Sequence, residues 1–432
     1  MIKNKRELVQ EGFANCVEYN ANGTVKTTSI KQALSTAPMN PPINFAQITA
    51  RDFMTWIVSM KKPNGNYHSF AAYAGHRSAF FNLFQDYHCV MSAELVRELS
   101  SHFKGFQHNV TSAVSQGRGQ IKVGKDPMTI GLYKRVALSM LENSSRDMIF
   151  ARLFMIMSWN LMSRAANTTS ICYGHLEWRD DALCVYFAHM KNDRRGSRPR
   201  DPRHVYANPL SPEICPILAL GVYWATYEVD ASATHLFPGN DQYERFRKVL
   251  GRVLESSSIS KELERRGNLA TDIGTHSMRK GASTYCSSGS TACPSAVAVH
   301  LRAGWSMGGV QDRYLRHDAA GDMFVGRTVS GLPILKPEFA SLPPHFVGGE
   351  AYIKQAKQIC FPSLPGSVEF VAEFALASLV YHLEFLRAKL PQNHPLFQSA
   401  LFADNRYRRD EYATYWYSAT RLFVERNTSR KE

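Results

Sequence analysis

Apolar residues recur with helical spacing in the first third of the chain. Four of them lie on one face of a single helix, namely Phe53, Trp56, Ile57 and Met60. Thr49, followed three residues later by Asp52, is typical of a capped helix start. Two further helices are predicted over residues 67–87 and 92–116. We therefore expect a small all-α domain at 44–116, preceded by an irregular polar N-terminal arm at 1–43.

Residues 117–127 separate this domain from the rest of the chain. The segment has almost no apolar residues and carries Arg118, Lys122 and Lys125, which is the composition of a linker. A basic linker suits a chain that wraps around a DNA duplex. A solvated connector explains the charge equally well.

The second region mixes the helical period with the two-residue period of strands. A turn at Arg179-Asp180-Asp181 separates two apolar runs and predicts a hairpin, which a short strand at 204–207 follows. Helices are predicted over 130–143, 145–163, 213–227, 241–257, 368–390 and 412–424, and from Thr275 onward. The expected fold class is mainly α with a small antiparallel β-sheet, comprising the all-α domain, a mixed α+β domain at 128–332 and a helical C-terminal extension at 333–432.

Charge and cysteine content narrow the functional classes. The chain has 51 Lys and Arg against 37 Asp and Glu, a net charge of +14, which favours a polyanionic partner such as a nucleic acid. A basic protein without such a partner is the alternative. The eight cysteines form no CxxC pair and are expected to be buried thiols in a reducing compartment. The longest apolar stretch, 368–386, contains three Glu and predicts a buried helix rather than a membrane span.

The segment Thr275-His276-Ser277-Met278-Arg279-Lys280-Gly281 carries the most specific chemistry. With Thr275 as the N-cap, His276 and Arg279 fall in the first turn of a helix and share one face. Free N–H groups and the helix dipole favour an anion there. Taken alone, a His and an Arg at this spacing are more often an ordinary surface pair.

Four other residues complete a possible site for attack on a phosphodiester. Arg164 follows an apolar helix, Lys191 follows a strand, and Trp305 precedes Tyr314 by nine residues. Two guanidiniums can bind the non-bridging oxygens bidentately, and a phenol beside such cations can act as nucleophile. Each residue separately also fits an ordinary role: a helix end, a turn, a core Trp or one Tyr among many.

The order Arg, Lys, His-x-x-Arg, Trp, Tyr resembles the catalytic domain of the tyrosine recombinase (phage integrase) superfamily. The wording is most similar to Crypton-type recombinases of eukaryotic mobile elements, as in Asn160-Leu-Met-Ser-Arg164-Ala-Ala-Asn167 and Arg302-Ala-Gly-Trp305. Residues 44–116 resemble the family's core-binding domain and 128–332 its catalytic domain. The chain departs from the bacterial pattern by Asn167 in place of an acid, by a longer interval between Arg279 and Trp305, and by a tail of over a hundred residues after Tyr314.

The resemblance implies DNA cleavage and rejoining through a 3′-phosphotyrosyl link, with integration or excision of DNA as the outcome. It assigns phosphate binding to Arg164 and Arg279, general acid to Lys191, base to His276, support of the phosphate to Trp305 and nucleophile to Tyr314. No metal or other cofactor is implied. The partners would be double-stranded DNA and further copies of the chain, as a tetramer, in the nucleus.

Further basic residues are candidates for contacts with the DNA backbone. They are Arg118, Lys122, Lys125, Arg194, Arg195, Arg198, Lys280, Arg302 and Arg313. Solvent-exposed charges are the alternative for each of them. Two other functions remain open: a non-catalytic, domesticated DNA-binding protein that retains the fold, and a type IB topoisomerase. The six site residues disfavour the first, and Trp305 and the short chain disfavour the second.

Overall fold

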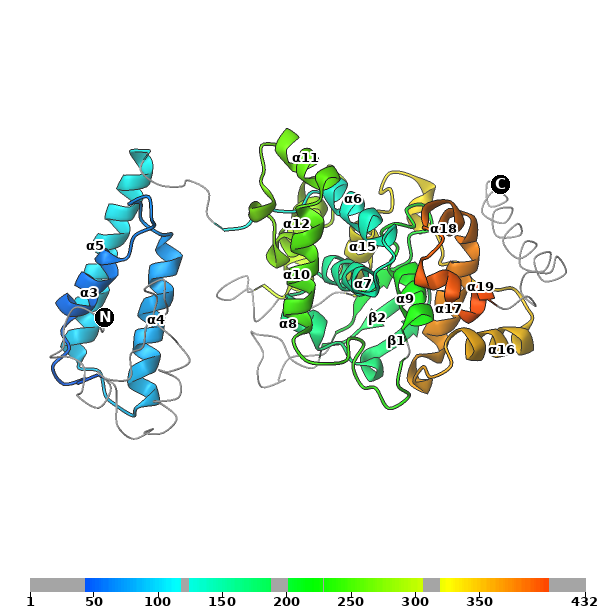
Figure 1. Ribbon diagram of the computed structural model, residues 1–432, viewed down its shortest axis with the longest axis horizontal. Coiled ribbons are helices and arrows are strands. Elements are labelled where there is room, and N and C mark those ends of the chain that lie inside the picture. Colours follow the sequence, from blue (N-terminus) through cyan, green and yellow to red (C-terminus); the bar gives the residue numbers. More distant parts are fainter. Residues whose placement is uncertain (1–42, 118–123, 188–200, 228, 306–318, 404–432) are drawn as a thin grey trace. The chain divides into compact units, whose positions relative to one another are not determined.

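The structure is a computed structural model, and it describes residues 43–117, 124–187, 201–227, 229–305 and 319–403 (Figure 1). The chain divides into two compact units, Met1–Gly124 and Lys125–Glu432. The first is helical, and the second combines helices with a three-stranded antiparallel sheet. The expected fold class, mainly α with a small antiparallel sheet, is confirmed.

Three helices form the described part of the first unit: α3 (Ala50–Ser59), α4 (Phe70–Asp86) and α5 (Ala93–Ser115). The expected capping box is present, because Thr49 and Asp52 satisfy each other's backbone N–H groups. The core is largely aromatic, and Phe53 stacks on Phe80 with ring centroids 4.3 Å apart. Tyr73 of α4 links this helix to the end of α3, because its hydroxyl donates to the Met60 carbonyl oxygen at 2.6 Å.

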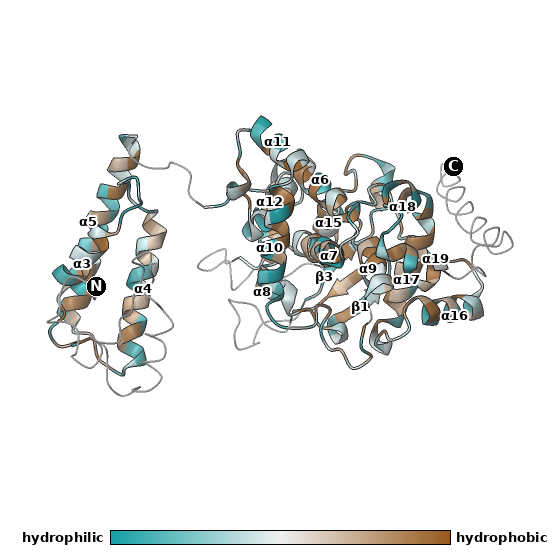
Figure 2. Cartoon of the chain, viewed as in Figure 1, coloured by the Kyte–Doolittle hydropathy of each residue, from teal (hydrophilic) through white to brown (hydrophobic). Residues whose placement is uncertain are grey.

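A buried helix, α7 (Arg146–Asn160), is the centre of the second unit. Its residues from Ile149 to Asn160 are all buried, because other helices pack around it. The strongest of these contacts are with α6 (Ile130–Leu141), α9 (Pro216–Thr226), α10 (Gln242–Leu254) and α12 (Thr275–Ser288). Figure 2 shows α9 as largely hydrophobic, whereas α11 (Ser257–Arg265), at the surface, is hydrophilic.

The sheet has the order β1-β2-β3, with strands β1 (Leu176–Arg179), β2 (Ala182–Val185) and β3 (Arg203–Tyr206). Asp180 closes the β1–β2 turn in the left-handed region, with φ 50°, which short polar residues tolerate. Helix α15 (Ala319–Val329) packs on β3. Their contact is close at Gly326, where an added Cβ would lie 2.4 Å from the His204 carbonyl oxygen.

Shorter helices complete the second unit. Helix α8 (Ala165–Thr169) follows α7, and α13 (Ala296–Ala303) follows α12. Short 3-10 helices lie at Tyr173–His175, Ala270–Asp272, Pro337–Ala340, Gly366–Val368 and Pro395–Gln398. Together these elements connect the central helix to the sheet and to the C-terminal helices.

The C-terminal extension is part of the second unit and does not form a separate one. Its helices are α16 (Glu350–Cys360), α17 (Glu369–Tyr381), α18 (Leu383–Lys389) and α19 (Ala400–Ala403). Helix α17 approaches α9 so closely that an added Cβ at Gly221 would lie 2.7 Å from the Ala375 carbonyl oxygen. The single helix expected at 368–390 is instead two helices separated by His382, whose backbone has ψ 17°. The helix expected at 412–424 lies outside the described residues.

The segment after Gly124 is bound to the start of α12. The Asp126 N–H donates to the Asp272 carbonyl oxygen at 2.8 Å, and the Met128 N–H donates to that of Ser277 at 2.9 Å. Residues 125–127, expected in the linker, therefore contact the second unit directly. This approach requires Gly281, because a Cβ there would lie 1.9 Å from the Met128 carbonyl oxygen and 2.8 Å from the Trp159 ring.

We expect Gly281→Ala to destabilise the second unit by about 1–3 kcal/mol or more, because the added methyl overlaps backbone. The measurement is the free energy of unfolding of the full chain in urea. Gly251→Ala in α10 is the matched control: nothing lies within 4 Å of the position that its Cβ would take, and alanine favours a helix by roughly 1 kcal/mol. Equal stability of the two variants would contradict this packing.

Candidate active site

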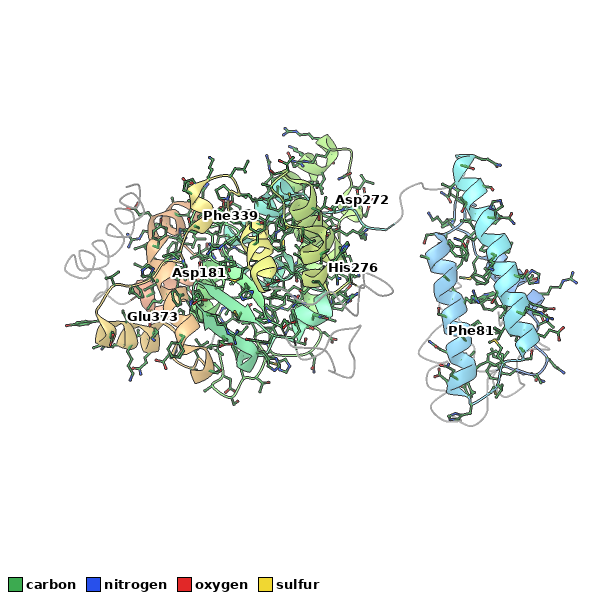
Figure 3. All side chains as sticks on the ribbon, turned by 180° about the vertical axis from the view of Figure 1, so that it is seen from behind. Phe81, Asp181, Asp272, His276, Phe339 and Glu373 are labelled. Carbon is green, nitrogen blue, oxygen red and sulfur yellow. The ribbon has the colours of Figure 1, made fainter. Side chains whose placement is uncertain are left out.

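The start of α12 differs from the expectation at one position. Gly274, not Thr275, is the N-cap, and the Gly274 N–H donates to the Ser277 hydroxyl oxygen at 3.0 Å. Thr275 is the first residue of the helix. His276 and Arg279 still lie in its first turns, as expected, and His276 is exposed (Figure 3).

Arg279 is buried and is held by the last residue of α13 and by Trp305 just after it. Its guanidinium donates to the Ala303 carbonyl oxygen and lies over the ring of Trp305, 5.2 Å from the centroid. Trp305 is fixed in turn, since its backbone N–H donates to the His300 carbonyl oxygen at 3.0 Å. Gly304 makes this turn possible, because it ends α13 in the left-handed region with φ 64°.

Arg164 follows the end of α7 and lies close enough to Arg279 for its charge to act on it. The chain reverses after α7 through Met162, which has φ 47°, and Arg164 is the N-cap residue of α8. A buried hydroxyl cluster holds the reversal: Thr168 Oγ1 lies 2.9 Å from the Ser158 hydroxyl and 2.6 Å from that of Ser163. Non-glycine residues rarely adopt such a φ, so the packing around it determines the position of Arg164.

The two guanidiniums influence each other electrostatically. Burial and then the positive charge of Arg164 lower the pKa of Arg279 to about 10. Among the described residues, neither arginine has a carboxylate within ion-pair distance. Two like charges, one of them buried and both without an acid, form a site that an anion would stabilise. Asn167, three residues after Arg164, is uncharged and offers it no ion pair.

The structure thus brings together three of the six expected site residues: Arg164, Arg279 and Trp305. His276 is on the same helix as Arg279, one turn before it. Lys191 and Tyr314 lie outside the described residues, as do Arg118, Lys122, Arg194, Arg195, Arg198 and Arg313. The positions of these residues relative to the arginines stay predictions.

Two lysines near His276 are exposed but already make internal hydrogen bonds. The Lys280 ammonium donates to the Lys125 carbonyl oxygen at 2.6 Å, and the Lys125 ammonium donates to the Thr271 carbonyl oxygen. Both bonds attach the segment after Gly124 to α12 or to the residues just before it. Each ammonium has further N–H groups, so both lysines remain candidates for phosphate contacts.

The expectation that Arg302 contacts DNA is wrong. Its side chain is fully buried and ion-paired with Asp322 at 2.6 Å, and it also donates to backbone carbonyl oxygens. Arg203, the first residue of β3, is also buried, and its guanidinium donates to carbonyl oxygens of α13. The sequence pattern does not distinguish these arginines from solvent-facing ones, because their acid and carbonyl partners are far away in the chain.

A polar cavity beside α12 was not expected from the sequence. It has a volume of about 700 Å³, and its lining includes Thr169, Ser170, His235, Asn240 and Tyr243. The Tyr243 hydroxyl lies 3.4 Å from that of Thr275, so the cavity adjoins the first turn of α12. Scattered hydroxyl residues have no pattern in the sequence that would have identified it.

Membrane spans and metal centres are not found in the part of the chain that the structure describes. No helix there is long and apolar enough to cross a membrane. No group of three or more His, Cys, Asp or Glu is arranged there to hold a metal ion.

Comparisons with known proteins give a weak overall likeness. No protein-family model matches the sequence, and no curated protein is significantly similar to it. Among solved structures, a Flpe mutant in a DNA Holliday junction complex is 10% identical with TM-score 0.42, and an FLP recombinase–Holliday junction complex is 11% identical with TM-score 0.40. Both cover 77% of this chain and 87% of the other. Ndc10, a platform for inner kinetochore assembly in budding yeast, is 12% identical with TM-score 0.31, over 90% of this chain and 88% of the other. Because the sequence identities and TM-scores are this low, a functional conclusion depends on the site residues and not on the comparisons.

We expect inorganic phosphate to stabilise the protein through Arg164 and Arg279. At tenfold its Kd, one bound anion contributes about 1.4 kcal/mol, which raises Tm by a few degrees at constant ionic strength. Because the pKa of Arg279 is about 10, its charge is present at neutral pH and is lost as pH rises through 10. The phosphate response should disappear over the same range.

Arg279→Met should lose this response at neutral pH, and Lys261→Met is the control for an exposed cation on another helix, α11. An equal rise in Tm for Arg279→Met and the unaltered chain would show that phosphate binds elsewhere.

Proposed function

We propose that the chain is a tyrosine-type DNA strand transferase that cuts and rejoins DNA through a 3′-phosphotyrosyl intermediate. The observation that carries the proposal is a buried guanidinium, that of Arg279, which lies over the Trp305 ring, is close enough to Arg164 to be affected by its charge, and has no acid partner among the described residues. The two arginines come from helices far apart in the sequence. Their proximity is what a phosphodiester site needs and what a chance pair of surface arginines would not give.

The residues of the site fit the charge that develops during the reaction. Attack on phosphorus places negative charge on the non-bridging oxygens, which two guanidiniums can bind with directed N–H groups. The burial of Arg279 strengthens this interaction, because screening by water is weaker there. The Trp305 indole N–H is a further donor that could reach a phosphate oxygen.

The covalent step is a simple exchange of ester bonds. The Tyr314 phenol oxygen attacks the phosphorus, the P–O5′ bond breaks, and a phosphotyrosyl bond to the 3′ strand forms. His276 takes up the phenol proton, and Lys191 gives a proton to the leaving 5′ oxygen. One phosphoester bond replaces another, so the reaction needs no nucleotide hydrolysis, and a 5′ hydroxyl reverses it by attack on the phosphotyrosine.

Other features agree with a DNA substrate. The net charge of +14 favours a polyanion, and Lys125 and Lys280 add exposed cations beside His276. We further propose, from the resemblance of the motifs, that the enzyme derives from a Crypton-type mobile element, acts in the nucleus, and assembles as a tetramer on two duplexes.

Covalent capture tests the proposal without knowledge of the target site. The full chain is incubated with a pool of nicked duplexes of randomised sequence, from which the short cleaved strand diffuses away so that attachment cannot reverse. We expect protein–DNA adducts that survive denaturation and that Tyr314→Phe does not form. Sequencing the captured DNA would then give a defined substrate.

Arg279→Met should reduce the rate of attachment by a factor of about 100 or more, while nonspecific DNA binding persists. DNA binding without any adduct would favour the non-catalytic DNA-binding alternative. Relaxation of supercoiled plasmid without sequence preference would favour the topoisomerase alternative.

We also expect attachment to proceed in EDTA, because the guanidiniums bind the phosphate oxygens that a metal would otherwise bind. The same assay with and without chelator measures this. Loss of adducts in EDTA and their return with Mg²⁺ would contradict the roles given to Arg164 and Arg279.

A further inference from the structure

A buried ionic cluster lies beneath the candidate active site. Its centre is Arg302 of α13, whose side chain is completely buried. The guanidinium donates to the Asp322 carboxylate at 2.6 Å, to the Asn160 carbonyl oxygen at 2.8 and 3.1 Å, and to the His204 carbonyl oxygen at 2.8 Å. One side chain thus joins α13 to the end of α7, to β3 and to α15.

Asp322 completes the link between β3 and α15. Its second carboxylate oxygen accepts hydrogen bonds from the His204 backbone N–H and from the His204 ring, each at 2.9 Å. Burial opposes the charge of Asp322, but Arg302, the His204 bond and Arg203 outweigh it and hold the pKa of this carboxyl far below its usual value. The Asp322 carboxyl therefore stays a charged acceptor for these hydrogen bonds at neutral pH.

Arg203 attaches the start of β3 to the end of α13. Its guanidinium donates to the carbonyl oxygens of Arg302 at 3.0 Å and Leu301 at 3.3 Å, and also to that of Asp201 at 3.1 Å. These carbonyls belong to the last turn of α13, where that of Leu301 also accepts a hydrogen bond from the Gly304 N–H at 2.9 Å. Arg203 therefore fixes residue 201 against the helix that leads to Trp305.

The residues of the cluster flank the two segments that contain Lys191 and Tyr314 in the sequence. Residues 188–200, which include Lys191, end where Asp201 is bound by Arg203. Residues 306–318, which include Tyr314, lie between Arg302 and Asp322, with only a few residues separating each end from the ion pair. The two proposed catalytic segments therefore start or end at the same buried cluster.

We propose that Arg203, Arg302 and Asp322 are positioning residues for the proposed acid and nucleophile, an inference that rests on the proposed function. The Arg302–Asp322 pair fixes both ends of the segment with Tyr314, and Arg203 fixes one end of the segment with Lys191. A buried ion pair is often no more stabilising than apolar residues of the same size. Its directed hydrogen bonds, in contrast, define the geometry of four elements at once.

The test uses conservative variants that keep the buried charge. Arg302→Lys and Arg203→Lys retain a cation but lose the planar fork that reaches several oxygens. Arg245→Lys is the matched control, because Arg245 also joins two helices of the same unit, through Asp147 at 2.7 Å and the Tyr227 hydroxyl at 3.0 Å. If Arg302→Lys does not fold, Asp322→Glu tests the same Arg302–Asp322 contact by changing its other member. All assays are run below the Tm of each variant.

Two substrates distinguish the segments. One is a nicked duplex whose sequence was recovered by the covalent capture described above. The other is the same duplex with sulfur in place of the bridging 5′ oxygen at the cleavage site, because a thiolate leaves without a proton from a general acid. We expect Arg203→Lys to attach about 100-fold more slowly to the oxygen substrate and to recover on the sulfur substrate. Arg302→Lys should be slowed by about the same factor on both, with DNA binding unchanged.

The failures that could occur are distinct. No adduct with the unaltered chain on either substrate would overturn the proposed function and this inference with it. Normal adducts with the unaltered chain, but rates for Arg203→Lys and Arg302→Lys that match Arg245→Lys, would overturn the positioning role alone. So would an equal response of both variants to the sulfur substrate, because the two substitutions would then not act on separate segments.

Discussion

The burial of Arg279 close to the positive charge of Arg164 is the constraint on which the rest of the candidate site depends. Two like charges separate unless packing holds them, and burial of Arg279 adds a desolvation cost. The fold supplies the necessary rigidity through the buried helix α7 and the left-handed turn at Met162. This arrangement holds positive charge where an anion can bind to it.

This constraint explains features that otherwise look unrelated. Gly281 lets α12, the helix that carries Arg279, approach Met128 and the Trp159 ring closely. Gly304 turns the chain so that Trp305 lies against the same guanidinium. The Arg302–Asp322 pair then ties α13 to β3 and α15. Helix, turn and buried ion pair together position one cationic site.

The sequence predicted local elements well and the partners of the arginines poorly. The capping box at Thr49 and Asp52 and the hairpin at Arg179–Asp181 are local patterns, and both are present. Arg302 was expected to face DNA and is instead buried, because its partners Asn160, His204 and Asp322 come from three other elements. No local pattern around Asp322 indicates that it meets an arginine from another helix.

The sequence by itself determined which chemistry is available: a basic chain, an HxxR turn at the start of a helix, and a Trp and a Tyr at a fixed interval. These are properties of residue type and spacing, which do not depend on folding. Only the tertiary structure decided which arginines lie at the candidate site and which are buried in the scaffold. That choice depends on burial and on carbonyl and carboxylate partners distant in the chain, which assigned Arg279 to the candidate site and Arg302 to the scaffold beneath it.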